Sequence, residues 1–392
     1  MSAEGNKFSK IFRGDPWIWA IVIILSLVGI LAVYSSTGGL AFSKQGGNTE
    51  FYFLRHTGFL LIGFGFLYLC HLINYQYFSR LSQLFIWISI ILLVVTLAVG
   101  SEINNATRVL PIPGLGITFQ TSDMAKLFLI MYIARYLSKK QEEIDSFKVF
   151  RNILLVIIIV VTLIAPENLS TALLVFVTCC LLLYIGRINF KYLALLGFAG
   201  ATAITLLVVI LLNINVDNVD NMSNSRIPTW KKRIETFTGK DSGESNYQQL
   251  QSKIAVATGG IFGKGPGNST QRNYLPHPYS DFIYAIIMEE YGFVGGAGMA
   301  LLFLILIFRC IRIVVESPKA FGALLALGLC LSISFQAFVN MGVAVGMLPV
   351  TGLTIPLVSM GGTSLIFNSI AFGVILSVSR TIKEEKEKLN AA

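Results

Sequence analysis

The sequence predicts an all-α polytopic membrane protein with about ten transmembrane helices. Only 13% of its 392 residues are charged and 54% are hydrophobic, whereas roughly 25% of the residues in a soluble domain carry a charge. Its apolar runs are too many and too long for the core helices of a soluble fold. Lys and Arg recur in every second loop between these runs, which is typical of a chain that crosses a bilayer repeatedly.

The apolar runs define the candidate spans. They cover residues 18–33, 59–69, 84–99, 125–137, 153–164, 169–185, 193–212, 282–308, 321–345 and 365–378. We do not expect the first run to be a cleaved signal peptide, because no small-residue cleavage site follows it. No internal repeat of roughly 20–50 residues is visible. We therefore expect one membrane domain over residues 1–392.

The positive charges predict that both termini lie in the cytoplasm. Lys and Arg precede the first span and mark every second loop and the tail: Lys7, Lys10, Arg13, Arg80, Arg135, Lys139, Lys140, Lys148, Arg151, Arg187, Lys191, Arg309, Arg312, Lys319, Arg380 and Lys383. The intervening short loops hold little beyond Lys44, Arg55 and Arg108. Cytoplasmic loops carry the excess of positive charge, and an even number of spans agrees with termini on one side.

One long polar loop, residues 213–280, separates the seventh and eighth spans and falls on the outer side. It is rich in Lys and Arg within a chain of net charge +9. Loops longer than about 60 residues do not control topology, so these cations are free to bind an anionic ligand. The alternative is a solvated basic loop that meets only lipid headgroups. Membrane lipid is the expected surface in either case, and no nucleic-acid partner is expected.

The end of this loop, residues 274–283, is the most informative stretch. Asp281 stands just before the eighth apolar run and follows two prolines and two tyrosines. An ionisable group at membrane depth indicates a functional site. A carboxylate at the water–lipid boundary is suited to a substrate that is part polar and part lipid. The alternative is an N-cap, in which Ser280 or Asp281 accepts from free backbone N–H groups; the two roles are compatible.

Four further features bear on the site. Residues 104–123 contain two prolines and two glycines that predict a fixed turn. The glycines of residues 259–267 permit close backbone approach, as in an anion-binding nest, although a plain loop also explains them. Residues 340–364 predict broken backbone at the outer face, which is tolerated only where it is buried in protein or lines a cavity. Glu289 and Glu290 lie inside an apolar run, so at least one should point into a polar interior.

Four separated motifs resemble those of one bacterial family, SEDS (shape, elongation, division and sporulation), whose members are FtsW, RodA and a sporulation homologue. The first runs from Arg108 through Gly116 and Phe119-Gln120-Thr121-Ser122-Asp123 to Lys126-Leu127, similar to R…G…FQPSE…KL. The others are Tyr247 to Gln271 with its glycines, Tyr274-Leu275-Pro276 with Ser280-Asp281-Phe282-Ile283, and Gln336 to Ser364. The resemblance covers nearly the whole chain in matching order.

The resemblance implies a ten-span peptidoglycan glycosyltransferase of the bacterial inner membrane. It would polymerise lipid II, a disaccharide-pentapeptide on undecaprenyl pyrophosphate, with its active site facing the periplasm or exterior. Implied partners are a class B penicillin-binding transpeptidase and other divisome membrane proteins. Thr351-Gly352 resembles FtsW, the division member, which implies septal cell-wall synthesis. A RodA-type role in elongation stays open.

The resemblance also implies roles for individual residues. Asp281 matches the family's essential outer-loop aspartate and would act as general base on the acceptor sugar hydroxyl, worth about 10²–10⁴ in rate. Cations, or a divalent metal such as Mg²⁺ or Mn²⁺, would stabilise the departing pyrophosphate; the sequence does not fix a metal requirement. Substrate-binding candidates are the cations Arg108, Lys126, Lys264 and Arg272, in falling order, with Gln120, Ser280, Ser359, Gly361 and Gly362.

Three of these four cations have a plainer alternative. Lys126 stands three residues after Asp123 and could form an i,i+3 ion pair, while Lys264 and Arg272 could meet lipid headgroups. Two positions also depart from the family pattern. Asp123 replaces its glutamate, and Asn168 replaces an aspartate after the fifth span. Glu167 is then either a substitute or an interfacial acid at a helix N-terminus.

Two rival functions come from other classes. A lipid II flippase or other transporter would keep its ionisable groups near the bilayer midplane and show inverted repeats. Most candidate groups here lie at the outer boundary, and only Glu289 and Glu290 favour transport. The second rival is a scaffold that recruits the transpeptidase without chemistry of its own.

Overall fold

The computed structural model describes residues 12–102, 107–112, 117–213, 230–231 and 244–391. Within this part of the chain, ten helices carry the predicted spans: α2 (Pro16–Ser36), α4 (Thr49–Leu72), α5 (Tyr75–Val99), α6 (Thr121–Lys139), α7 (Phe147–Ile164), α8 (Leu169–Ile185), α9 (Phe190–Asn213), α12 (Ile283–Glu316), α13 (Ala320–Ala344) and α14 (Thr363–Ala391). Each predicted apolar run falls on one of them to within a residue.

Eight of the described helices are long and apolar enough to cross a membrane, namely α2, α4, α5, α7, α9, α12, α13 and α14. α8 is apolar but shorter, and α6 carries four charged residues. The chain is therefore a mostly helical, multi-pass membrane protein.

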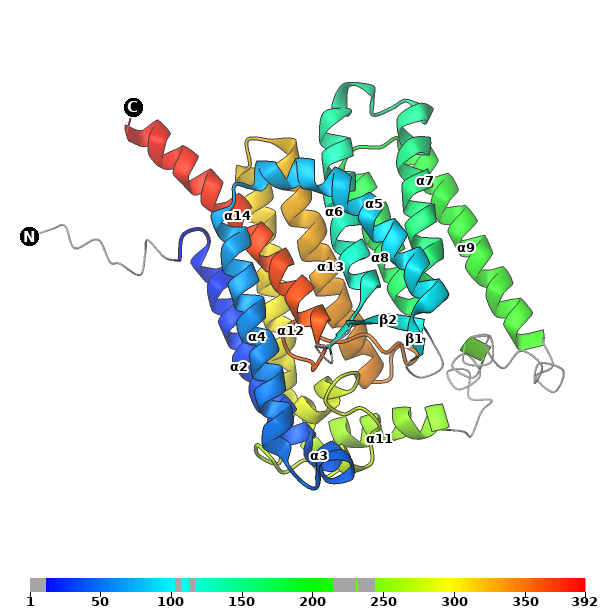
Figure 1. Cartoon of the computed structure of the whole chain (residues 1–392), viewed down its shortest axis with the longest axis vertical. Coiled ribbons are helices and arrows are strands. Elements are labelled where there is room, and N and C mark those ends of the chain that lie inside the picture. Colours follow the sequence, from blue (N-terminus) through cyan, green and yellow to red (C-terminus); the bar gives the residue numbers. More distant parts are fainter. Residues whose placement is uncertain (1–11, 103–106, 113–116, 214–229, 232–243, 392) are drawn as a thin grey trace, which may run out of the picture.

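α13 lies at the centre of the bundle, against α6, α8, α12 and α14 (Figure 1). It is largely buried, as is α14, whereas the described side chains of α9 are mostly exposed at the edge of the bundle. The start of α2 and the end of α14 lie at one end of the bundle, and α3 (Gly38–Gln45) and α11 (Glu244–Gly259) lie at the opposite end (Figure 1).

Polar side chains start several of the helices. Asp15 accepts hydrogen bonds from Trp17 N and Ile18 N at the start of α2, and Asn48, Asn74 and Ser146 cap α4, α5 and α7 in the same way. α12 differs, because it begins at Ile283 with Phe282 at the N-cap position. Neither Ser280 nor Asp281 is the N-cap residue, so that expectation was wrong.

The loop after α5 forms a small antiparallel sheet of order β1-β2-β3. Its strands are β1 (Ser101–Glu102), β2 (Thr107–Ile112) and β3 (Ile117–Phe119), and Leu110 pairs with Phe119. The sequence predicted a fixed turn here but no strands. Arg108 belongs to β2, but its side chain lies outside the described residues.

Candidate active site

Asp281 ends a turn that is held from two directions. Asn340 Nδ2, on α13, donates to the Asp281 carbonyl oxygen at 2.8 Å. Ser359 Oγ, in the loop before α14, donates to the Ser280 carbonyl oxygen at 2.8 Å. The half-buried Asp281 is therefore placed by the central helix and by the loop before α14 together, and Ser359 contributes through the backbone of the turn.

Tyr279 adds a neutral phenol to this turn. Its carbonyl oxygen accepts from Met360 N at 3.0 Å, and its hydroxyl lies 3.1 Å from His277 Nδ1. Burial raises the pKa of the Tyr279 phenol, and the negative charges of Asp281 and Tyr52 raise it further. The phenol thus stays protonated through the neutral range.

Two amides one turn apart on α13 hold the loop between α13 and α14. Gln336 Nε2 donates to the Thr354 carbonyl oxygen at 2.9 Å, and Asn340 Nδ2 donates to the Leu353 carbonyl oxygen at 2.6 Å. The broken backbone predicted here is thus bound to buried side chains, as membrane depth requires. Because Asn340 also binds the Asp281 carbonyl, one amide group joins the two loops.

Lys126 is buried on α6, and its side chain points toward α13. Its ammonium donates to Asp123 Oδ1 at 3.2 Å and to Gln336 Oε1 at 2.7 Å. The i,i+3 ion pair with Asp123 is therefore present. An ammonium has three N–H donors, so these two bonds leave donor capacity. Through Gln336 and Asn340, Lys126 belongs to the same hydrogen-bonded region as the Asp281 turn.

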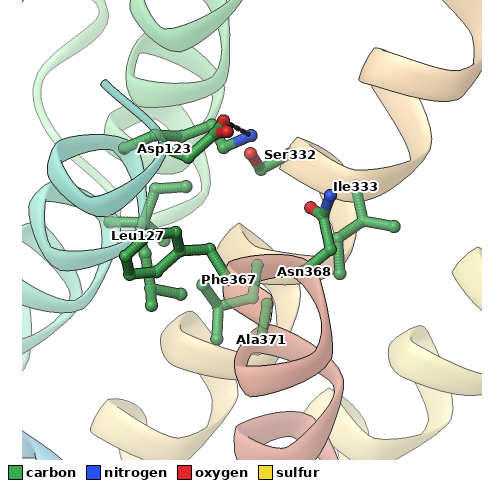
Figure 2. A pocket seen from close by; sticks show the side chains of 10 residues that line it. Asp123, Leu127, Ser332, Ile333, Phe367, Asn368 and Ala371 are labelled. Atoms are coloured by element: carbon green, nitrogen blue, oxygen red, sulfur yellow. Dashed lines mark hydrogen bonds and ion pairs between the residues drawn. The ribbon is translucent and has the colours of Figure 1, made fainter. Parts of the chain in front are cut away.

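A small cavity adjoins this ion pair between α6, α13 and α14 (Figure 2). Its polar lining is Asp123, Lys126, Ser332 and Asn368, and it has about 10 Å³ open to the centre of a water molecule. One ordered water needs about that space. Among the described residues, the buried Asp123 Oδ2 has no hydrogen-bond partner. This oxygen can accept a hydrogen bond from a water or a hydroxyl.

Gln120 and the glycines before α14 meet beside this region. Gln120 N donates to Thr363 Oγ1 at 3.1 Å, and Gly361 and Gly362 directly precede Thr363, with Gly362 at a φ of 53°. The three predicted residues therefore lie where the loop before α6 meets the loop before α14.

Lys264 and Arg272 make contacts that the sequence did not predict. Lys264 Nζ forms an ion pair of 2.5 Å with Glu289 Oε1, and Arg272 Nη1 donates to the Ser35 carbonyl oxygen at 3.1 Å. Both cations bind groups of the protein, so neither the headgroup alternative nor a direct substrate role is needed to explain them.

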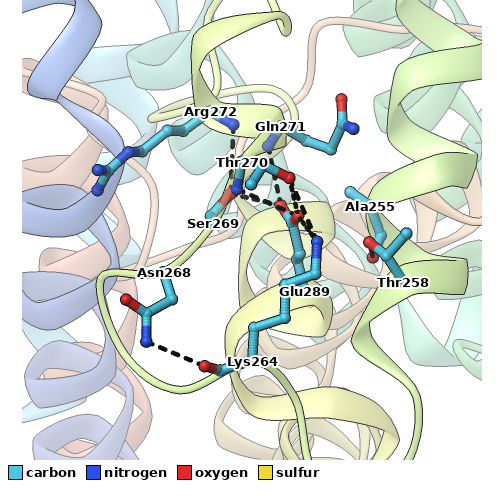
Figure 3. Close-up of polar contacts among 9 residues, drawn as sticks. All are labelled: Ala255, Thr258, Lys264, Asn268, Ser269, Thr270, Gln271, Arg272 and Glu289. Carbon is cyan, nitrogen blue, oxygen red and sulfur yellow. Dashed lines mark hydrogen bonds and ion pairs between the residues drawn. The ribbon is translucent and has the colours of Figure 1, made fainter.

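Glu289 is the centre of a compact cluster (Figure 3). Besides Lys264, its carboxylate accepts from Ser269 Oγ at 2.5 Å, Thr270 N at 3.2 Å, Thr270 Oγ1 at 2.8 Å and Gln271 N at 3.1 Å. Glu290 turns to another neighbour and accepts from Ser35 Oγ. Both side chains are buried, so both point into the protein.

A break in α12 brings these loops together. Gly292 has φ 67° and ψ −165°, a region that is essentially restricted to glycine. Phe293 N and Val294 N donate to the carbonyl oxygens of Gly260 and Ile261, at 2.8 Å and 3.1 Å. Residues 259–263 therefore occupy the gap in the helix.

Three glycines permit this contact. A Cβ at Gly259, Gly263 or Gly292 would meet a backbone oxygen of Met288, Glu290 or Ile261 at under 3.0 Å. The close approach expected of the glycine-rich segment is thus made to α12. Within the described residues, these three glycines serve helix packing and form no anion nest.

Glu167 and Asn168 follow α7, and Asn168 has a structural role. Asn168 Oδ1 accepts from Ser170 N at 3.1 Å and from Thr171 N at 3.2 Å, which caps α8. Glu167 is buried and accepts from Thr121 Oγ1 at 3.4 Å. The neutral side chain of Asn168 is therefore sufficient to cap α8.

The site's titratable groups can be compared with those of a metal centre. Within the described residues, no group of three or more His, Cys, Asp and Glu side chains could hold a metal ion. A protein-held metal cage does not fit these residues. A Mg²⁺ or Mn²⁺ ion would fit only with substrate phosphates as most of its ligands.

The family model for the cell cycle proteins FtsW, RodA and SpoVE matches residues 16–384. The chain belongs to this family. Stage V sporulation protein E of Bacillus subtilis is 33% identical over 382 residues, which is 93% of this chain and 97% of that protein. A probable peptidoglycan glycosyltransferase FtsW of Escherichia coli is 32% identical and covers 98% of this chain and 90% of its own.

Two solved structures have the same fold as this chain. A chain of a peptidoglycan synthase complex has a TM-score of 0.70 at 24% identity, over 94% of this chain and 98% of that chain. Rod shape determining protein RodA of Thermus thermophilus has a TM-score of 0.66 at 24% identity, over 94% and 97%. At these identities the likeness establishes the fold.

Proposed function

We propose that this chain is a peptidoglycan glycosyltransferase that polymerises lipid II for septal cell-wall synthesis. The observation that carries the proposal is Asp281, which Asn340 and Ser359 hold in one hydrogen-bonded region with the cation Lys126. Membership of the family supports it, since several relatives bear the name peptidoglycan glycosyltransferase FtsW.

The proposed topology has ten spans in one domain over residues 1–392. Both termini lie in the cytoplasm, and residues 213–280 form the extracytoplasmic loop. The common end of α2 and α14 in the bundle supports this arrangement (Figure 1). It places the Asp281 turn at the outer face of the bacterial inner membrane.

In the proposed reaction, the acceptor sugar hydroxyl attacks the anomeric carbon of the donor. The Asp281 carboxylate takes the hydroxyl proton as the new C–O bond forms. The bond from the anomeric carbon to the pyrophosphate breaks, and the lipid pyrophosphate leaves with the electron pair. Lys126, with its remaining N–H donor, and Arg108 are the cations proposed to stabilise that negative charge.

The other candidates are assigned by their contacts. Ser280 and Ser359 position the turn that bears Asp281, and Gln120, Gly361 and Gly362 form the neighbouring wall. Lys264 and Arg272 act by holding the outer loop against α12 and α2. Their proposed effect on the substrate is therefore indirect.

The proposed partner is a class B penicillin-binding transpeptidase, together with other divisome membrane proteins. A structural neighbour belongs to a peptidoglycan synthase complex that coordinates polymerization and crosslinking. A chain of the same fold is suited to the same kind of assembly.

Polymerisation of labelled lipid II tests the proposal. The protein and its transpeptidase are reconstituted in proteoliposomes, and glycan strands are resolved on gels. Asp281→Asn should reduce polymer by at least about 10², because the general base is lost. Glu316→Gln is the matched control, since Glu316 is an exposed acid at the far end of α12, the helix that follows Asp281. Polymer from Asp281→Asn near the control level would refute the assignment.

Glu289 and Glu290 no longer favour the transporter alternative. Five donors occupy the Glu289 carboxylate, and Glu290 binds α2. Both contacts are between elements of the protein. Translocation of labelled lipid II in liposomes without polymer formation would revive the transporter.

A further inference from the structure

The turn of residues 259–263 lies at a defined level along α12. Phe293 N and Val294 N bind the carbonyl oxygens of Gly260 and Ile261, and Lys264 N donates to the Glu289 carbonyl oxygen at 3.0 Å. These bonds align the turn with residues 289–294 of the helix. The glycine contacts around Gly292 leave no room for the turn to slide.

The outward face of this turn is apolar. Ile261 is 64% exposed and Phe262 is 82% exposed. Beside them on α12, Phe293 is 62% exposed and Val294 is 55% exposed. The exposed face continues along α12 through Leu301, Leu304 and Phe308. The turn thus extends an apolar face that belongs to a candidate membrane span.

The charged groups next to this turn point inward. Lys264 reaches inward to Glu289, and that carboxylate is buried with five donors around it (Figure 3). A loop in water normally presents its charges to the solvent and its apolar groups to the protein. Here the arrangement is reversed, as expected for a segment surrounded by hydrocarbon.

The depth of the turn agrees with this arrangement. Arg309 pairs with Asp15 at the other end of the apolar part of α12, and we place one edge of the hydrocarbon layer at this ion pair. Phe293 stands sixteen residues before Arg309, which is about 24 Å at the rise of a helix. The hydrocarbon core is about 30 Å thick. Phe293 and the turn beside it therefore fall a few ångströms inside the opposite edge.

We propose that residues 259–263 form a re-entrant turn that dips into the outer leaflet, where Ile261 and Phe262 contact lipid acyl chains. The turn would anchor the outer loop in the bilayer at the point where α12 is broken. Lipid contact does not depend on the glycosyltransferase assignment. Only the choice of leaflet follows from the proposed topology.

The test measures the surroundings of residue 262 in proteoliposomes that contain this protein alone. Phe262 is replaced with 4-trifluoromethylphenylalanine, and the ¹⁹F relaxation caused by dissolved oxygen is compared with that caused by a water-soluble nickel chelate. Oxygen concentrates in the bilayer, whereas the chelate stays in water. Phe308 is the matched lipid position, and Leu389, near the end of α14, is the matched water position; both are exposed in the structure.

The oxygen-to-nickel ratio at residue 262 should match that at residue 308 and exceed that at residue 389 at least about fivefold. A ratio equal to that at residue 389 would overturn the proposal. The proposal would also be overturned if the nickel chelate reached residue 262 in the protein alone and was excluded only after the transpeptidase was added. That result would identify a protein-docking surface. Both outcomes leave the polymerisation assay unaffected.

Discussion

Two buried carboxylates, Glu289 and Asp123, have opposite surroundings. Glu289 binds five donors from one loop, including the ammonium of Lys264. Asp123 binds Lys126 through Oδ1, while among the described residues its Oδ2 has no partner and faces a cavity. Both are acids beside a lysine, so the identity of the pair does not distinguish them.

The difference lies in spare hydrogen-bonding capacity. A buried acceptor without a partner costs about 1–3 kcal/mol, and such a cost is retained where a ligand or water completes the site. Glu289 has no such vacancy among the described residues and is suited to holding structure. Asp123 is suited to binding something that enters the cavity. The expected effects below follow from this contrast, from the largest to the smallest.

Glu289→Ala should give the largest loss of stability, because Lys264 and four other donors lose their acceptor together. Removing one partner of a buried pair costs about 3–5 kcal/mol. Unfolding of the detergent-solubilised protein, followed by circular dichroism against denaturant, measures the change. Glu316→Ala removes an exposed acid from the same helix and serves as the control. A Glu289 variant as stable as this control would contradict the structural role.

Gly292→Ala should come next, since its φ and ψ are restricted to glycine and the added methyl would meet the Ile261 backbone. Such backbone strain costs about 1–3 kcal/mol. A methyl group added at Gly298, on the same helix, would have no described atom within 4 Å other than the helix's own backbone. Gly298→Ala should therefore be neutral or stabilising by up to about 1 kcal/mol. Equal losses in the two variants would show that the break is not needed.

Asp123→Glu should have a small effect, because it adds one methylene next to an existing cavity and keeps the charge opposite Lys126. We expect polymerisation within about threefold of the parent, while Asp123→Asn, which removes the charge, should lose about tenfold or more. Gel-based polymer yield at equal protein compares the two variants. A loss as large in Asp123→Glu as in Asp123→Asn would show that the cavity cannot accept the longer side chain.

Tyr279→Phe should leave the shape of the pH profile unchanged. The phenol's ordinary pKa is 10.0 and its environment raises it, so the group is neutral at every pH up to about 10. Because the pKa of the phenol is higher in the folded state, any stability that the neutral phenol adds is present below about pH 10. It is lost as the pH rises through the folded-state pKa. Polymerisation rates between pH 6 and about 9.5 test this; an alkaline limb that moves in the variant would contradict it.

The helices were predictable from the sequence because hydropathy is a local property. Each apolar run from residue 18 to residue 378 falls on one helix. The position of Asp281 before a membrane helix was also visible. The ion pair between Lys264 and Glu289 was not, since it joins residues 25 positions apart through a loop whose path no local pattern encodes.

The break in α12 was hidden for a different reason. Gly292 is one of four glycines between residues 292 and 298, and only its backbone conformation and its contact with residues 261–263 set it apart. The N-cap prediction for Asp281 failed because capping depends on where the first helical turn begins, which Phe282 occupies here. The roles of Arg108 and of the other proposed substrate contacts stay predictions.

One amide nitrogen of Asn340 donates hydrogen bonds to the main-chain carbonyl oxygens of both Asp281 and Leu353. Any displacement of residues 353–354 must break one of these two hydrogen bonds or move the turn that bears Asp281. We therefore expect a compound that binds against residues 353–354 to slow turnover without competing for the sugar, and increasing lipid II should not relieve such inhibition.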